Sequence, residues 1–265
     1  MKRVAAFLIA LFCAAAAASA DERTEQIDRL LELSGLSRQL AEISTFASHQ
    51  IQTYGSSLEP QAYRELESSI ARAFDSSRLT AAAKQHYLDH YDERRLRAWT
   101  ETLSSPLAKR MLALESQPGK DDDFDQAMAY ARRHDDAPAM QHRRDLLKRL
   151  DGASKASELA LDSQMAVLRS VLIASNSTLT DNKRLNAKTL EDAVTQTRDQ
   201  MESALLTVAD ATYLYTYREI SDNDLEQYVG YYESDTGRWA MNLAQSAIKA
   251  ALAEATTFVE RDAAW

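Results

Sequence analysis

The stretch LEDAVTQTRDQMESALLTVADATYLY, from Leu190 to Tyr215, decides the fold class. Its apolar and weakly polar positions recur every three or four residues, which places them on one face of a long helix. These positions are Leu190, Val194, Thr197, Met201, Leu205, Val208, Ala211 and Tyr215. No comparable run alternates apolar and polar residues at the period of a strand. The stretch therefore predicts an amphipathic helix whose striped face is buried.

The same spacing returns in four further segments, which begin at Leu36, Tyr63, Leu161 and Ile248. The chain contains only six Gly and four Pro in 265 residues, too few for the turns of sandwiches, barrels or doubly wound sheets. We therefore predict an all-α fold. A compact bundle of shorter helices is favoured over a coiled-coil oligomer by breaks at Gly35, Gly55–Pro60, Pro118–Gly119, Pro138 and Gly152.

The first twenty residues have the pattern of a secretory signal peptide. Lys2 and Arg3 precede an apolar run from Val4 to Ala18, and Ala18-Ser19-Ala20 supplies the small residues of a cleavage site. The run is shorter than the ~20 residues of a membrane-spanning helix, so an uncleaved anchor is the less favoured alternative. We expect cleavage after Ala20 and export to the periplasm.

Removal of residues 1–20 would also remove Cys13, the only cysteine. Phe12 stands before it, where lipidation requires a small residue, so we expect no lipid anchor. The exported chain would have no disulfide and no thiolate site. The whole chain has a formal charge of −9, which disfavours nucleic acid as a partner. No later stretch is apolar enough for a membrane span, so no integral membrane segment is expected after cleavage.

Two halves of the chain resemble each other. Leu30–Arg38 matches Leu147–Lys155, and further along the chain four residues match at an offset of 129. Leu96, Trp99, Ser105 and Lys109 correspond there to Leu225, Tyr228, Ser234 and Arg238. We predict two related helical modules. The N-terminal module spans 21–116, a linker and connecting helix span 117–144, and the C-terminal module spans 145–265.

Each module contains a helical hairpin with a recognisable turn. Ser105 places a capping hydroxyl before Pro106, the residue best suited to a first turn. In the second copy Ser234 caps the following helix, and Gly237 allows a close approach of a neighbouring helix or ring. Arg238 completes this structural motif.

The segment Tyr231-Tyr232-Glu233-Ser234-Asp235-Thr236-Gly237-Arg238 resembles the signature of the bacterial family known as domain of unknown function 2059. That signature runs aromatic, Tyr, any residue, Ser, Pro, any residue, Gly, basic. The resemblance covers Tyr213 to Ala255, with a degenerate first copy around Leu96 to Met111. Asp235 departs from the usual Pro, and Ala108 replaces Gly in the first copy. The resemblance implies an exported helical protein and no established reaction or catalytic residues.

Aromatic residues are dense between Tyr213 and Trp239. One interpretation is a tyrosine-rich core whose hydroxyl groups find polar partners at its edge. The other is a surface that stacks on sugar or peptide, and its candidate binding residues are Tyr215, Tyr231, Tyr232 and Trp239.

Catalytic and metal motifs are weak. His86 and His90 share a helix face with Glu93 and are weak zinc candidates, and Asp121, Asp123 and Asp125 lack the remaining features of a calcium loop. Ser221-Asp222-Asn223 and Ser246-Ala247-Ile248-Lys249 copy triplets of penicillin-recognising enzymes, but in reversed order and on the wrong scaffold. We therefore predict no catalytic residue, no metal and no cofactor.

Three functions stay open. The leading hypothesis is a non-enzymatic periplasmic interaction protein whose partner is an envelope protein or a cell-wall fragment. The second is a binder of a small lipid or saccharide in a pocket between helices, and the third is an envelope hydrolase that uses carboxylates.

Overall fold

A computed structural model describes residues 21–55, 58–117, 123–134 and 137–263. The predicted signal peptide and Asp121 of the candidate calcium loop lie outside these residues. The structure is 87% helical and has no strand in the part it describes, which confirms the all-α prediction. None of the described helices is long and apolar enough to cross a membrane.

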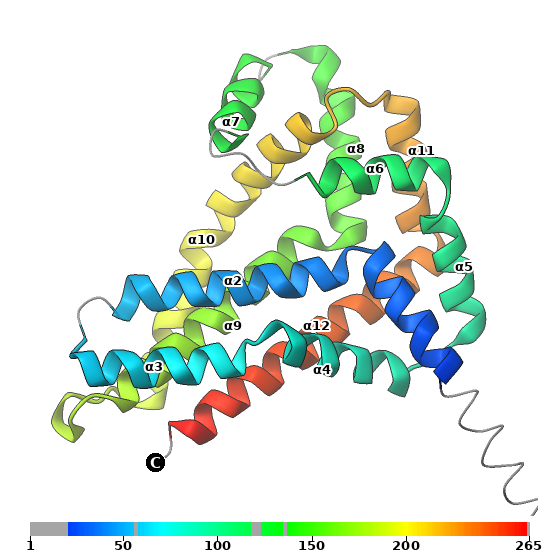
Figure 1. Ribbon diagram of the computed structural model, residues 1–265. Coiled ribbons are helices and arrows are strands. Elements are labelled where there is room, and N and C mark those ends of the chain that lie inside the picture. The colour runs from blue at the N-terminus through cyan, green and yellow to red at the C-terminus, as the bar shows by residue number, and fades with distance from the viewer. Residues whose placement is uncertain (1–20, 56–57, 118–122, 135–136, 264–265) are drawn as a thin grey trace, which may run out of the picture.

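The first half consists of a helix over residues 21–33 followed by five further helices (Figure 1). These are α2 (Leu36–Gly55), α3 (Pro60–Ala73), α4 (Ser76–Asp89), α5 (Glu93–Leu103) and α6 (Pro106–Glu115). The remaining elements are α7 (Asp123–Arg133), α8 (Pro138–Ser154), α9 (Ala156–Ser177), the 3-10 turn η1 (Asp181–Lys183), α10 (Ala187–Thr216), α11 (Asp222–Glu233) and α12 (Asp235–Asp262).

Side-chain caps and prolines set many of the helix starts. Pro60, Pro106 and Pro138 occupy the first turns of α3, α6 and α8, where the missing N–H costs nothing. Among the described residues, six N-cap side chains accept a hydrogen bond from the third residue of the helix that follows. They belong to Asp75, Asp92, Ser105, Asn186, Ser221 and Ser234.

Two helix junctions depend on a left-handed backbone. Gly35, with φ of 73°, joins the helix of residues 21–33 to α2, and Lys155, with φ of 59°, joins α8 to α9. The break predicted at Gly152 was wrong, because α8 continues through that residue to Ser154. A tight junction needs only one residue in the left-handed region, and a lysine fills that position here although glycine adopts it more readily.

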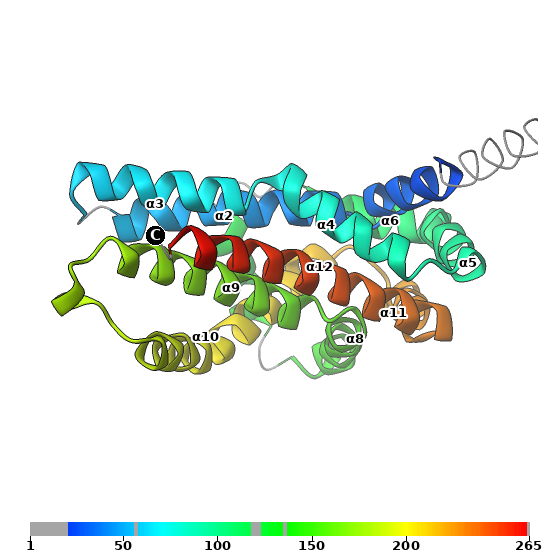
Figure 2. The same ribbon diagram turned by 90° about the horizontal axis from the view of Figure 1, so that it is seen from below.

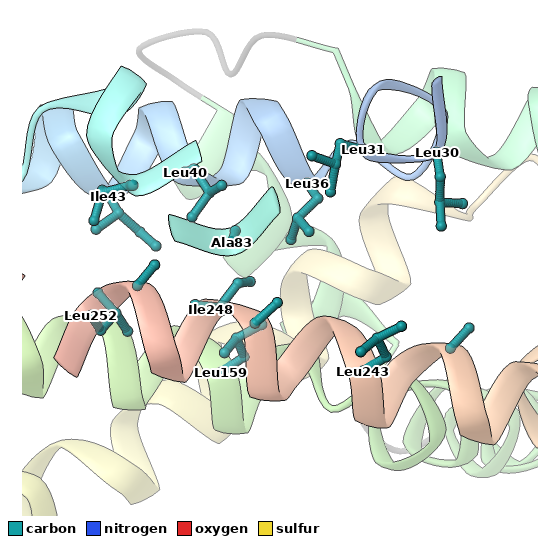
Figure 3. Packing of buried hydrophobic residues seen from close by; sticks show 14 of the residues in the cluster. Leu30, Leu31, Leu36, Leu40, Ile43, Ala83, Leu159, Leu243, Ile248 and Leu252 are labelled. Atoms are coloured by element: carbon teal, nitrogen blue, oxygen red, sulfur yellow. The ribbon is translucent and has the colours of Figure 1, made fainter. Parts of the chain in front are cut away.

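The helices form layers around α9 and α12. Seen from below, α2, α3 and α4 lie on one side of these two helices, and α8 and α10 lie on the other (Figure 2). Helix α12 packs against α3, α4, α5 and α9. Leu40 and Ile43 of α2 face Ile248 and Leu252 of α12 (Figure 3). One continuous cluster of buried residues draws on both predicted modules.

Helix α10 differs from the expected buried rod. Val194 and Ala211 of its stripe are buried, but Met201, Leu205 and Val208 are only half-buried. The helix packs on α9 through a small separate cluster that includes Met165 and Leu168. Its later part instead meets α7 and α8. The stripe thus predicts the helix correctly but overstates its burial.

The predicted boundary at residue 145 falls inside α8 and not in a linker. The order of helices nonetheless runs in parallel in the two halves: the hairpin α5–α6 of one half has its counterpart in α11–α12 of the other. Helix α5 packs on α12 and α11 packs on α6, so each hairpin contacts the other. Duplication of a module remains a prediction that this arrangement supports.

Candidate functional site

A cleft of about 330 Å³ opens where the two left-handed junctions approach the ends of several helices. Its walls combine leucines, aromatic rings and a few polar groups. The lining residues discussed below are Arg38, Glu42, Trp99, Glu115, Tyr213, Tyr217, Tyr232, Ala244 and Gln245. They come from α2, α5, α6, α11, α12 and the C-terminal end of α10 with its cap Tyr217, so only the folded chain assembles the site.

Tyrosines beside the cleft occur as pairs four residues apart, which places both members of a pair on one helix face; of the four, Tyr213, Tyr217 and Tyr232 line the cleft. On α10 the rings of Tyr213 and Tyr217 stack with centroids 6.2 Å apart. On α11 the rings of Tyr228 and Tyr232 meet edge to face at 5.1 Å. Trp99 of α5 completes the group with an edge contact of 5.5 Å to Tyr232.

Glu115, the last residue of α6, connects the two tyrosine pairs. Its Oε1 accepts a hydrogen bond of 2.5 Å from the Tyr217 hydroxyl and one of 2.8 Å from the Tyr228 hydroxyl. Tyr228 and Tyr232 also share a hydrogen bond of 3.0 Å. Glu115 as a whole stays exposed, but its carboxylate points into packed protein, because Tyr217 and Tyr228 are only 1% and 0% exposed.

The electrostatics of the cluster follow from this packing. Burial raises the pKa of Glu115, and the two tyrosine hydrogen bonds and the Arg38 charge oppose that rise. Burial also raises the pKa of Tyr217, and the Glu115 carboxylate raises it further. The tyrosines are therefore neutral hydrogen-bond donors at ordinary pH, and they can hold a carboxylate without a basic partner.

Asp151 binds the far side of the α10 pair. Its Oδ1 accepts a hydrogen bond of 3.1 Å from Tyr213 and one of 3.0 Å from the backbone N–H of Ser157. The second bond satisfies an otherwise free N–H group at the start of α9. Asp151 thus ties Tyr213 to the α8–α9 junction, and burial raises the pKa of this tyrosine as well.

Two further polar side chains of the cleft, Arg38 and Gln245, also have partners. Arg38 Nε lies 3.6 Å from Glu42 Oε1, one helical turn away. Gln245 Oε1 accepts a hydrogen bond of 3.0 Å from Lys155 Nζ, while Gln245 Nε2 is buried without a partner among the described residues.

The four aromatic candidates from the sequence do not share one surface. Tyr232 is buried beside Trp99 and lines the cleft. Tyr231 and Trp239 are half-buried against the core, and Arg95 lies 5.7 Å from the Trp239 ring. Tyr215 lies elsewhere, in an open groove between α7 and α10, with Arg218 stacked 3.9 Å over its ring.

The turn residues of the predicted motif lie together at the ends of the hairpins. Ser234 Oγ accepts a 2.9 Å hydrogen bond from Gly237, and Arg238 donates to the Glu233 carbonyl. A Cβ atom on Gly237 would lie 2.6 Å from the Tyr232 carbonyl oxygen and closer still to that of Tyr231. The close approach expected at Gly237 therefore involves backbone. Ser105 caps α6 in the same way, before Pro106.

The turn of the first hairpin explains its Ala108. Two residues, Ser104 and Ser105, separate α5 from α6, whereas Ser234 alone separates α11 from α12. The longer turn is consistent with a side chain at this position, and Ala108 is fully buried there.

His86 and His90 stack with ring centroids 4.3 Å apart, and no group of three candidate metal ligands occurs among the described residues. Glu93, the third predicted ligand, pairs with Arg97 at 2.7 Å. His86 Nε2 lies 2.8 Å from Ser246 Oγ, which itself donates to the Leu243 carbonyl. His86 then donates to Ser246, so the pair does not have the geometry of an activated nucleophile.

Sequence reasoning missed Glu115, Trp99 and Arg38 as parts of a site. The spacing of Tyr213 with Tyr217 and of Tyr228 with Tyr232 could have indicated two ring pairs. Nothing in the sequence near Glu115 indicates that a carboxylate from α6 joins them.

No family model matches the chain, and the searches of curated proteins and of solved structures give no match. The resemblance to domain of unknown function 2059 therefore rests on the residues of the hairpin turn and their surroundings.

Proposed function

We propose that this chain is a non-enzymatic binding protein of the bacterial periplasm, and that the cleft beside Glu115 is its binding site. The observation that carries the proposal is the cleft itself, in which aromatic rings, leucines and a hydrogen-bonded carboxylate surround about 330 Å³. That volume lies at the small end of the range for ligand sites, and the mixed lining is typical of them. A fragment of cell-wall or lipid material of modest size fits this description. The periplasmic location follows from the predicted signal peptide.

A binding role is favoured over hydrolysis by the state of the carboxylates. Glu42 is the second carboxylate among the described residues that line the cleft, and it is ion-paired with Arg38. A glycoside hydrolase needs two carboxylates that flank the scissile bond. Glu115 instead accepts hydrogen bonds from two tyrosines, which hold it in place. It still lines the cleft.

An envelope protein is the second candidate partner, and the open groove between α7 and α10 favours it. Tyr130 and Tyr215 meet edge to face there at 6.0 Å, with Arg132, Arg133 and Arg218 around them. Tyrosine and arginine are the residues enriched at protein interfaces.

The proposal is tested by native mass spectrometry of protein purified from the periplasm. We expect a small molecule to accompany the wild type. Ala244→Phe, which fills the cleft from α12, should abolish this mass, while Ala204→Phe on the exposed face of α10 should retain it. Retention of the mass by Ala244→Phe, or absence of any bound mass from the wild type, would contradict a cleft ligand. Loss of an envelope-protein partner on Tyr215→Ala would instead support the groove.

A further inference from the structure

The cleft contains a carboxylate that has no cationic partner among the described residues. Glu115 Oε1 is held by two neutral phenols, and Oε2 has no hydrogen-bond partner there. No described basic side chain lies within ion-pair distance of Glu115, although Arg38 lines the same cleft. The carboxylate is thus positioned by neutral donors, and Arg38 acts on it only through its charge at longer range.

The basic groups nearby already have partners. Arg38 pairs with Glu42, so these two charges offset each other. Lys155 donates to the amide oxygens of Asn242 and Gln245 at 2.9 and 3.0 Å. On the far side of Tyr213, Asp151 is a second carboxylate, and the donors to it within the described part of the chain are neutral. Two carboxylates therefore flank the Tyr213–Tyr217 pair, and negative charge exceeds positive charge around the cleft.

The aromatic lining also favours a positively charged ligand. The face of an aromatic ring carries negative potential and attracts an organic cation, and the attraction increases where water is excluded. Among the aromatic side chains that line the cleft, Tyr213 is half-buried, whereas Trp99, Tyr217 and Tyr232 are buried, so Tyr213 is the most accessible ring. A carboxylate beside a tyrosine ring is the combination that recognises ammonium groups.

We propose that the ligand of this cleft is a small organic cation, a molecule with an ammonium group that lies between the Glu115 carboxylate and the ring of Tyr213. This assignment rests on the function proposed above, because it names the chemical class of the same ligand. The ammonium group supplies the positive charge that the protein leaves out, and the leucines beside it contact the carbon portion of the ligand.

Two probes of equal shape isolate the charge. Choline and 3,3-dimethylbutan-1-ol differ in that a quaternary nitrogen of the first is a carbon in the second. Isothermal titration of the wild type near neutral pH should show choline binding about tenfold more tightly than the neutral alcohol. Glu115→Gln, which keeps an acceptor for the tyrosines, should remove this preference. Glu202→Gln, a change at an exposed carboxylate of α10 that does not line the cleft, should leave it in place.

Equal affinity for the two probes in the wild type would overturn the assignment, as would a preference for choline that survives Glu115→Gln. The wild-type comparison needs no variant, so instability of Glu115→Gln cannot hide the answer. If neither probe binds while the purified protein still carries a cleft ligand, the cationic assignment fails and the proposed function stands. If neither probe binds and no ligand accompanies the protein, both fail.

Discussion

Replacement of Gly237 by alanine tests how the α11–α12 hairpin is built. The new Cβ would lie 2.6 Å from the Tyr232 oxygen and 2.8 Å from its carbonyl carbon, inside the 3.0 Å that real Cβ contacts respect. Both neighbours are backbone atoms, so no side chain can rotate away. Relief requires the turn to open, which also weakens the hydrogen bond from Gly237 to Ser234.

The magnitude follows from three opposing effects. Overpacking costs about 1–3 kcal/mol, and a weakened N-cap costs about 1 kcal/mol. Alanine in place of glycine inside a helix returns about 1 kcal/mol. We expect a net loss of about 1–3 kcal/mol in the free energy of unfolding, or a fall of ~2–12 °C in Tm for a chain of this size.

Urea and thermal unfolding followed by circular dichroism measure this effect, and Gly230→Ala is the matched control. Gly230 lies within α11 with nothing within 4 Å of its Cβ position, so alanine there should stabilise the protein by ~0.5–1 kcal/mol. Opposite signs for the two substitutions support the account of the turn. A Gly237→Ala protein as stable as Gly230→Ala would refute it.

Three further predictions concern the surroundings of the site. Glu115→Ala should destabilise the protein by about 1–3 kcal/mol in urea unfolding, because it removes the acceptor of Tyr217 and Tyr228. Glu115→Gln keeps an acceptor and should destabilise the protein less. Equal losses for the two variants would count against the hydrogen-bond role of Glu115. Arg143 is only 11% exposed, lies 2.7 Å from Asp222 and donates to the Tyr217 and Ile220 carbonyls. Arg143→Ala should therefore lower the free energy of unfolding by ~3 kcal/mol, against less than ~1 kcal/mol for the exposed Arg149→Ala. Similar losses for the two variants would show that the buried contacts contribute little. Burial and the neighbouring His90 lower the pKa of His86, although Asp89 opposes them. The contribution of this histidine to the free energy of unfolding should therefore be complete above pH ~6.5 and decline as the pH falls below it. A plot of Tm against pH that is no flatter in His86→Asn than in the wild type would exclude this cause.

Much of the fold could be predicted from spacing and caps. The stripe from Leu190 to Tyr215 predicted α10, and Ser105 and Ser234 predicted the starts of α6 and α12, because these signals act within a few residues. The break at Gly152 was mispredicted because glycine can also lie inside a helix, as it does here with no neighbouring atom within 4 Å of its Cβ position. The residue with the left-handed backbone is Lys155.

The site was harder to predict for a physical reason. Tyr217, Tyr228 and Glu115 meet only through packing of α6, α10 and α11, and residues 115 and 228 are far apart in the chain. The sequence could indicate that the Tyr213–Trp239 region is unusual and that its hydroxyls need polar partners. It could not indicate that one distant carboxylate supplies the partner for two of them, nor that Tyr215 lies in a separate groove.

The central claim is that a small ligand binds in the tyrosine cleft, and carbon-labelled tyrosine rings report on it directly by NMR. On titration of protein refolded from urea, and so freed of any bound ligand, with the small-molecule fraction of a periplasmic extract, the ring signals of Tyr213, Tyr217 and Tyr232 should shift. The signals of Tyr63 and of the buried Tyr87 on α4, which do not line the cleft, should stay in place. Shifts confined to Tyr130 and Tyr215, or no shift at all, would contradict the claim.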